Sequence, residues 1–355
     1  MELPFDSGSW ERKRNAGSRG RITIDTKHEK FKGTQRTPVW PWQSWIVVEW
    51  RNPKYNTWHV VYAGVITEAS YEWASKKLTL SHEDIWTIFS KRIVTTDRSN
   101  DISSSKVTWT NLSKATMIKK IIQNITNNFG SPLIYDLPIS LPADAAGSED
   151  MTVYGYNFDK ASDLINDYIE DDEGPDIDFR PRWSSEGTLE WVMEVNANKT
   201  RVWDYDLDVD KSSVENMNYT LSGAYLVNKM YGTGEGTERR TLTRQSSSDG
   251  FPYPALEDAE KFSGMKSLER LQSATTGARR AKDGAIRQLD MAVRADGSPA
   301  LNELALGGSV RWKADKDSWL LSGWHPFELI GLSGDLTSEV VKIETQEMEG
   351  RSSGA

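Results

Sequence analysis

The stretch from Trp40 to Val94 constrains the fold of this chain more than any other part of the sequence. Short apolar runs rich in Val, Ile, Trp and Tyr are separated by polar turn segments such as Arg51 to Lys54. Consecutive runs of this kind predict antiparallel β-strands. Gly64 interrupts one run, which is typical of a bulge or of a sharp corner in a barrel. Because closure removes the free edges of a small sheet, we interpret this stretch as a β-barrel.

The segment from Trp45 to Val48 is apolar at every position. Side chains alternate between the two faces of a strand, so this segment predicts a strand that is covered on both faces. Leu78 and Leu80 alternate instead with polar residues, which is typical of a strand with one face in the core.

Composition limits the class of protein. The chain has 355 residues, which is enough for two or three domains, and its net charge is −9. That acidic balance argues against recognition of nucleic acid through a general basic field. The chain has no cysteine, which excludes a disulfide scaffold and a thiolate zinc site. The sequence shows no secretory signal and no apolar run near the ~20 residues that span a bilayer.

Helical periodicity occurs in three places. Apolar residues at three- and four-residue spacing predict helices from Leu112 to Asn128 and from Lys160 to Glu170. We expect Asn111 to cap the first of these helices. A third helix is predicted to begin after Ser267 and to continue to about Ala285.

The order of these patterns predicts a β-rich α+β fold with two β-barrel domains. The first barrel is expected over residues 1–98, and an α/β domain over 99–202 includes a hairpin of Ile177–Trp183 and Thr188–Val195. The second barrel is expected to be split into 203–250 and 300–348. A helical insertion over 251–299 would separate its halves, and 349–355 would be a disordered tail.

Two patterns raise the possibility of a metal site, and neither is specific. One is an alternating acidic run with the spacing of a calcium loop and a carboxylate at position 12, made by Asp204, Asp206, Asp208, Asp210 and Glu215. Val209 occupies the position where that loop requires glycine, so we favour a half-exposed strand. The other is the set of four scattered histidines, His28, His59, His82 and His325. We therefore predict no metal ligands and no cofactor.

Other candidate sites have simpler interpretations. A group of acidic residues surrounds a Gly-Pro turn and consists of Glu170, Asp171, Asp172, Glu173, Asp176 and Asp178. Two of them could form the carboxylate pair of a glycosidase, but a crowded acidic group of this kind is more often a solvated loop. Gly232, Gly234 and Gly236 lead into a predicted strand and not into a helix, which favours a hairpin tip over a dinucleotide loop. The sequence has no G-x-S-x-G motif. We predict no catalytic residues, and hence no enzyme.

Several stretches taken together resemble the minor tail proteins of siphophages that infect actinobacteria, in the group of baseplate-hub or tail-tip proteins. The matching pieces occur in order along nearly the whole chain. They are TPVWPWQSWIVVEW, VVYAGVITEASYE, LTLSHEDIW, EGPDIDFRPRW, LEWVMEV, LVNKMYGTGEG, FPYPALED, GGSVRW and GWHPFELIGLSGD.

This resemblance implies a structural role and transfers no catalytic residue. Proteins of the group are similar to the tail-tube fold, with two related barrels in each subunit and three subunits in a ring. The implied partners are other copies of the chain, the distal tail protein, the tape-measure protein and other minor tail proteins. Contact with the host surface would be indirect, and DNA would meet the protein only in transit. The implied location is the tail tip of a virion assembled in host cytoplasm.

Two alternatives remain open at the level of sequence. The 15 tryptophans and the acidic loop also suit a carbohydrate-binding module or a glycoside hydrolase, in which Asp176→Asn or Trp183→Ala would abolish activity. The second alternative is a distal tail protein or a receptor-binding protein of the same particle. The chain ends at Ala355 in a short Gly/Ser-rich tail, so we expect no appended peptidase or lytic domain.

Overall fold

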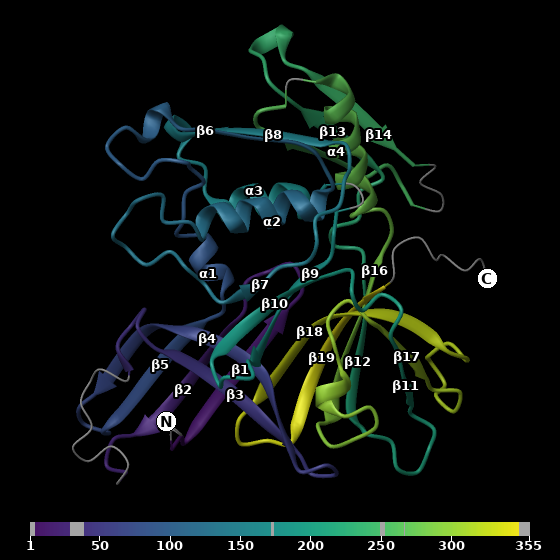
Figure 1. Ribbon diagram of the computed structural model, residues 1–355. Coiled ribbons are helices and arrows are strands. Elements are labelled where there is room, and N and C mark those ends of the chain that lie inside the picture. Colours follow the sequence, from purple (N-terminus) through teal and green to yellow (C-terminus); the bar gives the residue numbers. More distant parts are fainter. Residues whose placement is uncertain (1–3, 29–38, 172–173, 249–252, 266, 348–355) are drawn as a thin grey trace.

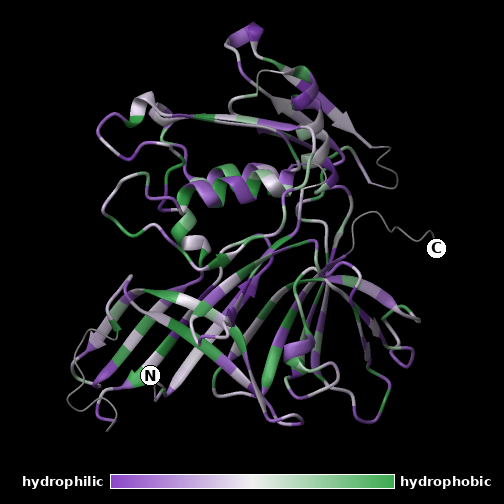
Figure 2. Ribbon diagram, viewed as in Figure 1, coloured by the Kyte–Doolittle hydropathy of each residue, from purple (hydrophilic) through white to green (hydrophobic). Residues whose placement is uncertain are grey.

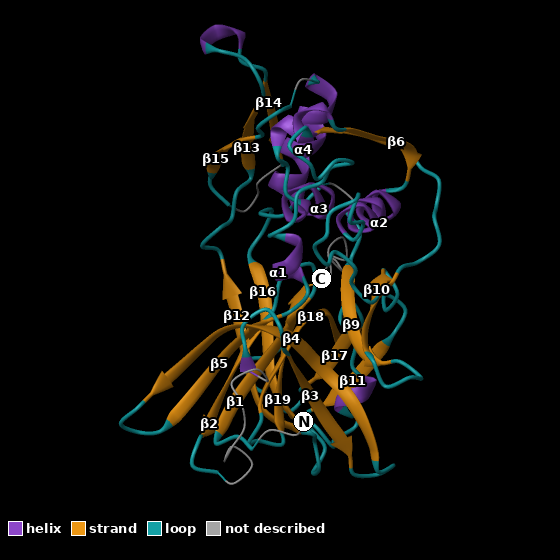
Figure 3. Ribbon diagram, turned by 60° about the vertical axis from the view of Figure 1, so that its left-hand side comes forward, coloured by secondary structure: helices purple, strands orange, loops and turns teal. Residues whose placement is uncertain are grey.

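The computed structural model describes residues 4–28, 39–171, 174–248, 253–265 and 267–347. Most strands gather in one large curved sheet, which fills the lower half of Figure 1. Above it lie an α/β layer and a smaller insertion, and the turned view in Figure 3 places the longer helices on that side. Within the described residues, no helix is long and apolar enough to cross a bilayer. The predicted tail, 349–355, lies outside the described residues.

Within the described residues, the large sheet has eleven strands. Nine of them follow one antiparallel path, in the order β12-β16-β19-β18-β1-β2-β5-β4-β3, while β17 and β11 branch from β18. The strands are β1 (Ser7–Lys13), β2 (Arg19–Asp25), β3 (Trp45–Asn52), β4 (Thr57–Glu72), β5 (Lys77–Glu83), β11 (Val202–Asp206), β12 (Val214–Ser222), β16 (Ile286–Arg294), β17 (Ser309–Lys313), β18 (His325–Asp335) and β19 (Val340–Glu347).

The two predicted barrel regions join in this sheet at β1 and β18. These strands pair antiparallel, from Ser9 opposite Asp335 to Lys13 opposite Gly331. Among the described strands, β3, β11 and β12 each pair with one neighbour only, so hydrogen bonds do not close the sheet. The structure confirms a β-rich fold with antiparallel sheets. It does not confirm two closed barrels.

A single apolar core runs under both halves of the sheet. Trp10, Tyr62 and Leu80 from the first half belong to the same buried cluster as Trp312 and Leu329 from the second. In Figure 2 the apolar residues along these strands follow the curve of the sheet. Because apolar burial is the main favourable term in folding, this shared core holds the two halves together.

The α/β layer covers the outer face of β3 and β4. It contains α1 (Trp86–Phe89), α2 (Lys114–Ile125), α3 (Ala161–Ile169), β6 (Lys106–Leu112), β7 (Ile139–Ser140), β8 (Glu149–Tyr154), β9 (Ile177–Trp183) and β10 (Leu189–Val195). Trp45 and Val47 pack on the core of this layer, while Ile46 and Val48 belong to the core of the large sheet. The prediction that this strand is covered on both faces is therefore confirmed.

The α/β layer also tests the helix predictions. The second helix and the hairpin lie where the periodicity placed them. The first helix is shorter than predicted, and Ser113, not Asn111, is its N-cap, because the Ser113 side chain accepts a hydrogen bond from the N–H of Thr116. Asn111 has φ = 57° and lies in a strand that pairs with β8.

The described part of the segment over which a helical insertion was predicted, 251–299, contains one helix and also strands. The chain leaves the sheet at Ser222 and returns at Ile286, which are paired across β12 and β16. Between them lie β13 (Lys229–Thr233), β14 (Thr243–Ser247), β15 (Glu257–Lys261) and α4 (Leu268–Arg280). We call residues 223–285 the insertion. Among the described residues, short 3-10 helices also lie at Ile102–Ser104, Gly155–Asn157, Glu238–Arg240 and Leu301–Glu303.

Candidate functional site

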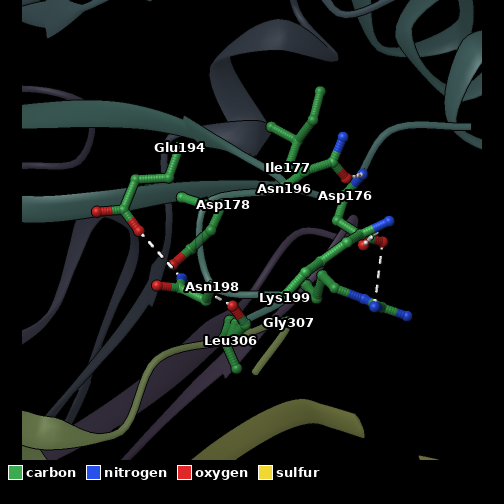
Figure 4. Close-up of a pocket in the computed structure, with 11 residues that line it drawn as sticks. Asp176, Ile177, Asp178, Glu194, Asn196, Asn198, Lys199, Leu306 and Gly307 are labelled. Carbon is green, nitrogen blue, oxygen red and sulfur yellow. Dashed lines mark hydrogen bonds and ion pairs between the residues drawn. The ribbon is translucent and has the colours of Figure 1, made fainter. Parts of the chain in front are cut away.

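The acidic group around the Gly-Pro turn is divided in the structure. Asp172 and Glu173 lie outside the described residues, and Asp171 forms an ion pair with Lys114 at 2.9 Å. Asp176 and Asp178 instead line a pocket between the β9–β10 hairpin, the turn after β1 and the loop before β17 (Figure 4). This pocket is where the α/β layer meets both halves of the large sheet.

Asp176 is held by two cations. Its Oδ1 lies 3.1 Å from Arg14 Nη1, and its Oδ2 lies 3.0 Å from Lys199 Nζ. The same Arg14 nitrogen lies 2.5 Å from Glu328 Oε1 on β18. Arg14 therefore ties the start of β9 to the second half of the sheet.

Asp178 is the more deeply buried carboxylate. Its Oδ2 lies 2.5 Å from Arg12 Nη2 on β1, and both side chains are largely removed from water. Burial raises the pKa of Asp178, and the Arg12 guanidinium opposes that rise. Glu194 lies opposite Asp178 in the hairpin and accepts a hydrogen bond from Asn198 Nδ2 at 3.3 Å.

Backbone hydrogen bonds reinforce these ion pairs. The N–H of Asn15 donates to the carbonyl of Ile177, and Asn15 Oδ1 accepts from the N–H of Ile177 at 2.7 Å. The side chain of Asn198 also donates to the carbonyl of Leu306 at 2.9 Å. Asn15 has φ = 56°, a left-handed conformation that asparagine tolerates better than most residues.

This arrangement suits a structural joint better than an acid–base site. We call the ion pairs of Arg12 with Asp178 and of Arg14 with Asp176 the joint. A glycosidase needs one carboxyl that holds a proton and one that is free to act as a base or nucleophile. Here both oxygens of Asp176 and one oxygen of Asp178 contact cations. Charged groups paired in this way mainly fix the relative position of the strands that carry them.

A second pocket lies beside the first, between the large sheet and the α/β layer. Asp84 lines it and accepts hydrogen bonds from the N–H groups of Ser18 and Trp86. Burial raises the pKa of Asp84 to about 7, although these hydrogen bonds act in the opposite direction. Asp84 thus anchors the start of β2 and of α1.

The run that resembles a calcium loop does not gather around one point. Asp204 on β11 pairs with Arg311 at 2.6 Å, and Asp206 pairs with Lys313 at 3.2 Å. Asp208 accepts hydrogen bonds from the backbone of the β17–β18 loop. Residues 202–206 alternate between exposed and buried, as the half-exposed strand interpretation predicts. In the part of the chain that the structure describes, no acidic or histidine cluster has the geometry to hold a metal ion.

The glycine run lies in a hairpin, as predicted. β13 and β14 pair antiparallel, and a short 3-10 helix forms the tip. A Cβ atom on Gly232 would lie 1.9 Å from Thr275 Oγ1, so glycine allows α4 to pack closely on β13.

The histidines are separated. His82 is buried and its Nδ1 lies 3.1 Å from the hydroxyl of Tyr62, and burial lowers the pKa of His82 to about 4. The ring of His325 packs at a tilt against Trp312 with ring centroids 4.7 Å apart, and His59 Nε2 lies 2.8 Å from the Thr57 hydroxyl.

Sequence reasoning missed Arg12 and Arg14, the cations of the joint. They lie in or just after β1, which begins at Ser7 in a mostly polar segment. The only signal in that segment is Trp10, a single large apolar residue among polar ones, which is buried in the structure.

Comparison with known proteins shows the fold. No family model matches the sequence, and neither does any curated protein. The 43 kDa tail protein of prophage MuSo2 from Shewanella oneidensis superposes with a TM-score of 0.60 and 10% identity, covering 98% of this chain and 95% of that one.

Two further tail proteins are similar. The match to a tail protein from Neisseria meningitidis has a TM-score of 0.54 and 12% identity, covering 98% of this chain and 93% of that one. Prophage tail protein gp18 from Listeria monocytogenes superposes with a TM-score of 0.51 and 10% identity, covering 99% of this chain and 90% of that one. At these identities the similarity is one of fold, and the resemblance to the siphophage hub group stays a prediction.

Proposed function

We propose that this protein is a structural component of a phage tail, with no enzymatic role. The observation that carries this proposal is the fold, which matches a prophage tail protein over 98% of this chain and 95% of the other. An added domain would leave part of either chain unmatched, so the likeness concerns the whole architecture. The paired carboxylates of the joint also favour a structural part.

More specifically, we propose a baseplate-hub ring, made of three copies, at the tip of the tail. A subunit of a ring needs surfaces on which its neighbours can be seated. Exposed aromatic residues and open strand edges, both present here, supply surfaces of that kind. The proposed partners are other copies of the chain, the distal tail protein, the tape-measure protein and other minor tail proteins.

The acidic balance of the chain suits a channel. A net charge of −9 repels the DNA backbone, so DNA and the tape-measure protein would pass through such a ring without adhering to it. The host surface would then be reached through other parts of the tip.

Gold-labelled antibodies against the full chain, applied to particles that carry it, test this proposal. We expect label at the end of the tail away from the head. Label on the head would contradict a tail role. Label along the tail or on peripheral fibres would favour a distal tail or receptor-binding role instead.

One observation favours carbohydrate binding as a second candidate function. Tyr154 and Tyr156 stack with their ring centroids 5.2 Å apart at the end of the β6–β8 ribbon, and both are exposed. Lys106 lies beside Tyr154, and flat aromatic faces next to polar groups suit sugar rings. A glycan array with the full chain, repeated with Tyr156→Ala, tests this function. Binding that the substitution abolishes would support it, and an array without signal would remove it.

A further inference from the structure

The last strand of the large sheet has an open edge. The Ser44 carbonyl accepts from the N–H of Ile66, and the Asn52 carbonyl accepts from the N–H of Asn56. The backbone N–H and C=O groups of successive residues in an antiparallel strand point alternately toward and away from the partner strand. Ser44 and Asn52 are even-numbered, so the backbone groups of the odd-numbered residues of β3 point away from β4. These are Trp45, Val47, Glu49 and Arg51. Among the described strands, none pairs with that side of β3.

Exposed aromatic residues lie before and after β3 in the chain or contact its residues from β4 and β9. They are Trp40 and Trp42 before β3, Tyr55 in the turn after it, Trp58 opposite Arg51 on β4, and Trp183, whose Nε1 donates to Glu49. Each is between 44% and 62% exposed. We call β3 with these five residues the aromatic edge. Trp10 and Trp312 are buried, whereas Trp73, Trp319 and Trp324 are exposed elsewhere on the molecule, so the aromatic edge is distinguished by its position beside an open strand and not by exposure alone.

A row of this kind is unfavourable in a lone subunit. An unpaired apolar strand edge is a template for another strand, and clustered exposed tryptophans are typical of protein contacts. The aromatic edge is therefore suited to a partner that supplies a strand.

The opposite end of the same sheet supplies one. β12 has nine residues against eight in β3, and among the described strands it pairs only with β16. Every step between β12 and β3 along the sheet is antiparallel, and the number of steps is even. The two edges therefore point the same way.

Length distinguishes β12 from the other open edge, β11. β11 has five residues, against nine in β12 and eight in β3. The charges of its Asp204 and Asp206 are already paired with Arg311 and Lys313. The exposed residues of β12 include Glu215 near its start and then Asn216, Asn218 and Thr220, which are uncharged and can form hydrogen bonds beside Glu49.

We propose that β12 of a second copy of this chain pairs in parallel with the aromatic edge. The contact joins two different surfaces, so repeating it generates a ring when the rotation closes. This inference rests on the proposed ring and assigns the two strands that meet in it. The five aromatic side chains would then be covered by the neighbouring copy.

Cysteine cross-linking tests this contact directly, because the chain has no cysteine of its own. Glu49→Cys is mixed in turn with Asn216→Cys, Asn218→Cys and Thr220→Cys, and each mixture is oxidised after assembly. We expect a disulfide dimer with at least one of the three partners and none with Trp73→Cys, an exposed position in the β4–β5 turn. Double-cysteine chains should give covalent products that stop at the ring size.

Rings without any of these cross-links would overturn the proposed contact and leave the proposed function intact. A chain that stays monomeric at every concentration would overturn both. A second measurement is the association constant of Trp58→Ala, which we expect to be weaker by on the order of tenfold or more. Trp73→Ala is the matched control and should associate like the wild type. Equal loss in both variants would contradict the aromatic edge as the contact.

Discussion

Replacing Arg12 with methionine tests whether the charged joint holds the α/β layer on the sheet. The Arg12 and Asp178 side chains are 12% and 9% exposed, and their closest atoms are 2.5 Å apart. Methionine keeps much of the apolar stem of arginine and removes its charge, which leaves the Asp178 carboxylate buried without its cation. Removing one member of a buried pair costs about 3–5 kcal/mol in the free energy of unfolding.

The effect of Arg12→Met should depend on pH in a defined direction. Burial already raises the pKa of Asp178, and loss of the cation raises it further. The folded state then binds more protons than the unfolded state above the usual pKa of Asp. Stability is therefore gained as pH falls, and the variant should approach the wild type in acid. Urea unfolding at about pH 8 and about pH 5 measures the difference.

Two controls separate the joint from a general effect of charge. Arg311→Met removes an exposed ion pair with Asp204, in which the closest atoms are 2.6 Å apart. We expect little change in the free energy of unfolding because solvent screens this pair. The double variant Arg12→Met/Asp178→Leu removes both charges and should recover most of the stability. If Arg12→Met lowers the free energy of unfolding no more than Arg311→Met does, or if this loss does not depend on pH, the reasoning about the joint is wrong.

Two further predictions concern buried positions. Burial lowers the pKa of His82 from 6.5 to about 4, so the folded state binds fewer protons and stability is lost as pH falls from about 6.5 toward 4. His82→Gln should show a smaller loss in urea unfolding over that range, and an equal loss would contradict the assignment. Gly232→Ala places a methyl group against Thr275 and should destabilise the insertion by about 1–3 kcal/mol, whereas Gly223→Ala has open space and should not. Hydrogen exchange of the insertion amides compares the two variants, and equal protection would contradict the packing argument.

Local patterns predicted the parts of the fold that depend on local sequence. The hairpin of β9 and β10 and the helix α3 lie where periodicity placed them, because their apolar residues repeat at the period of the element. The apolar run from Trp45 to Val48 also predicted correctly that β3 is covered on both faces.

The missed strands have weaker local signals. β1 buries Trp10 among polar neighbours, and β16 follows an Ala-rich helix whose periodicity we extended too far, to about Ala285. Both strands are stabilised by pairing with strands distant in sequence, β1 with β18 and β16 with β19. Tertiary pairing of this kind leaves little trace in a short window.

The candidate site was predictable only in part. The sequence singled out Asp176 and Asp178 as a crowded acidic group. Their partners Arg12 and Arg14 lie more than 150 residues earlier, in a mostly polar segment without the alternating pattern of a strand. Whether such carboxylates are free or paired is decided by the fold, since the pairing requires β1 to lie beside β9.

The most direct test of the central claim is a cryo-EM map of the tail tip of a particle that carries this chain. The account predicts three copies around the tail axis, with the large sheets side by side and β3 of each copy next to β12 of its neighbour. A tip in which this chain is absent, or is present as isolated monomers with the aromatic edge open to solvent, would contradict it.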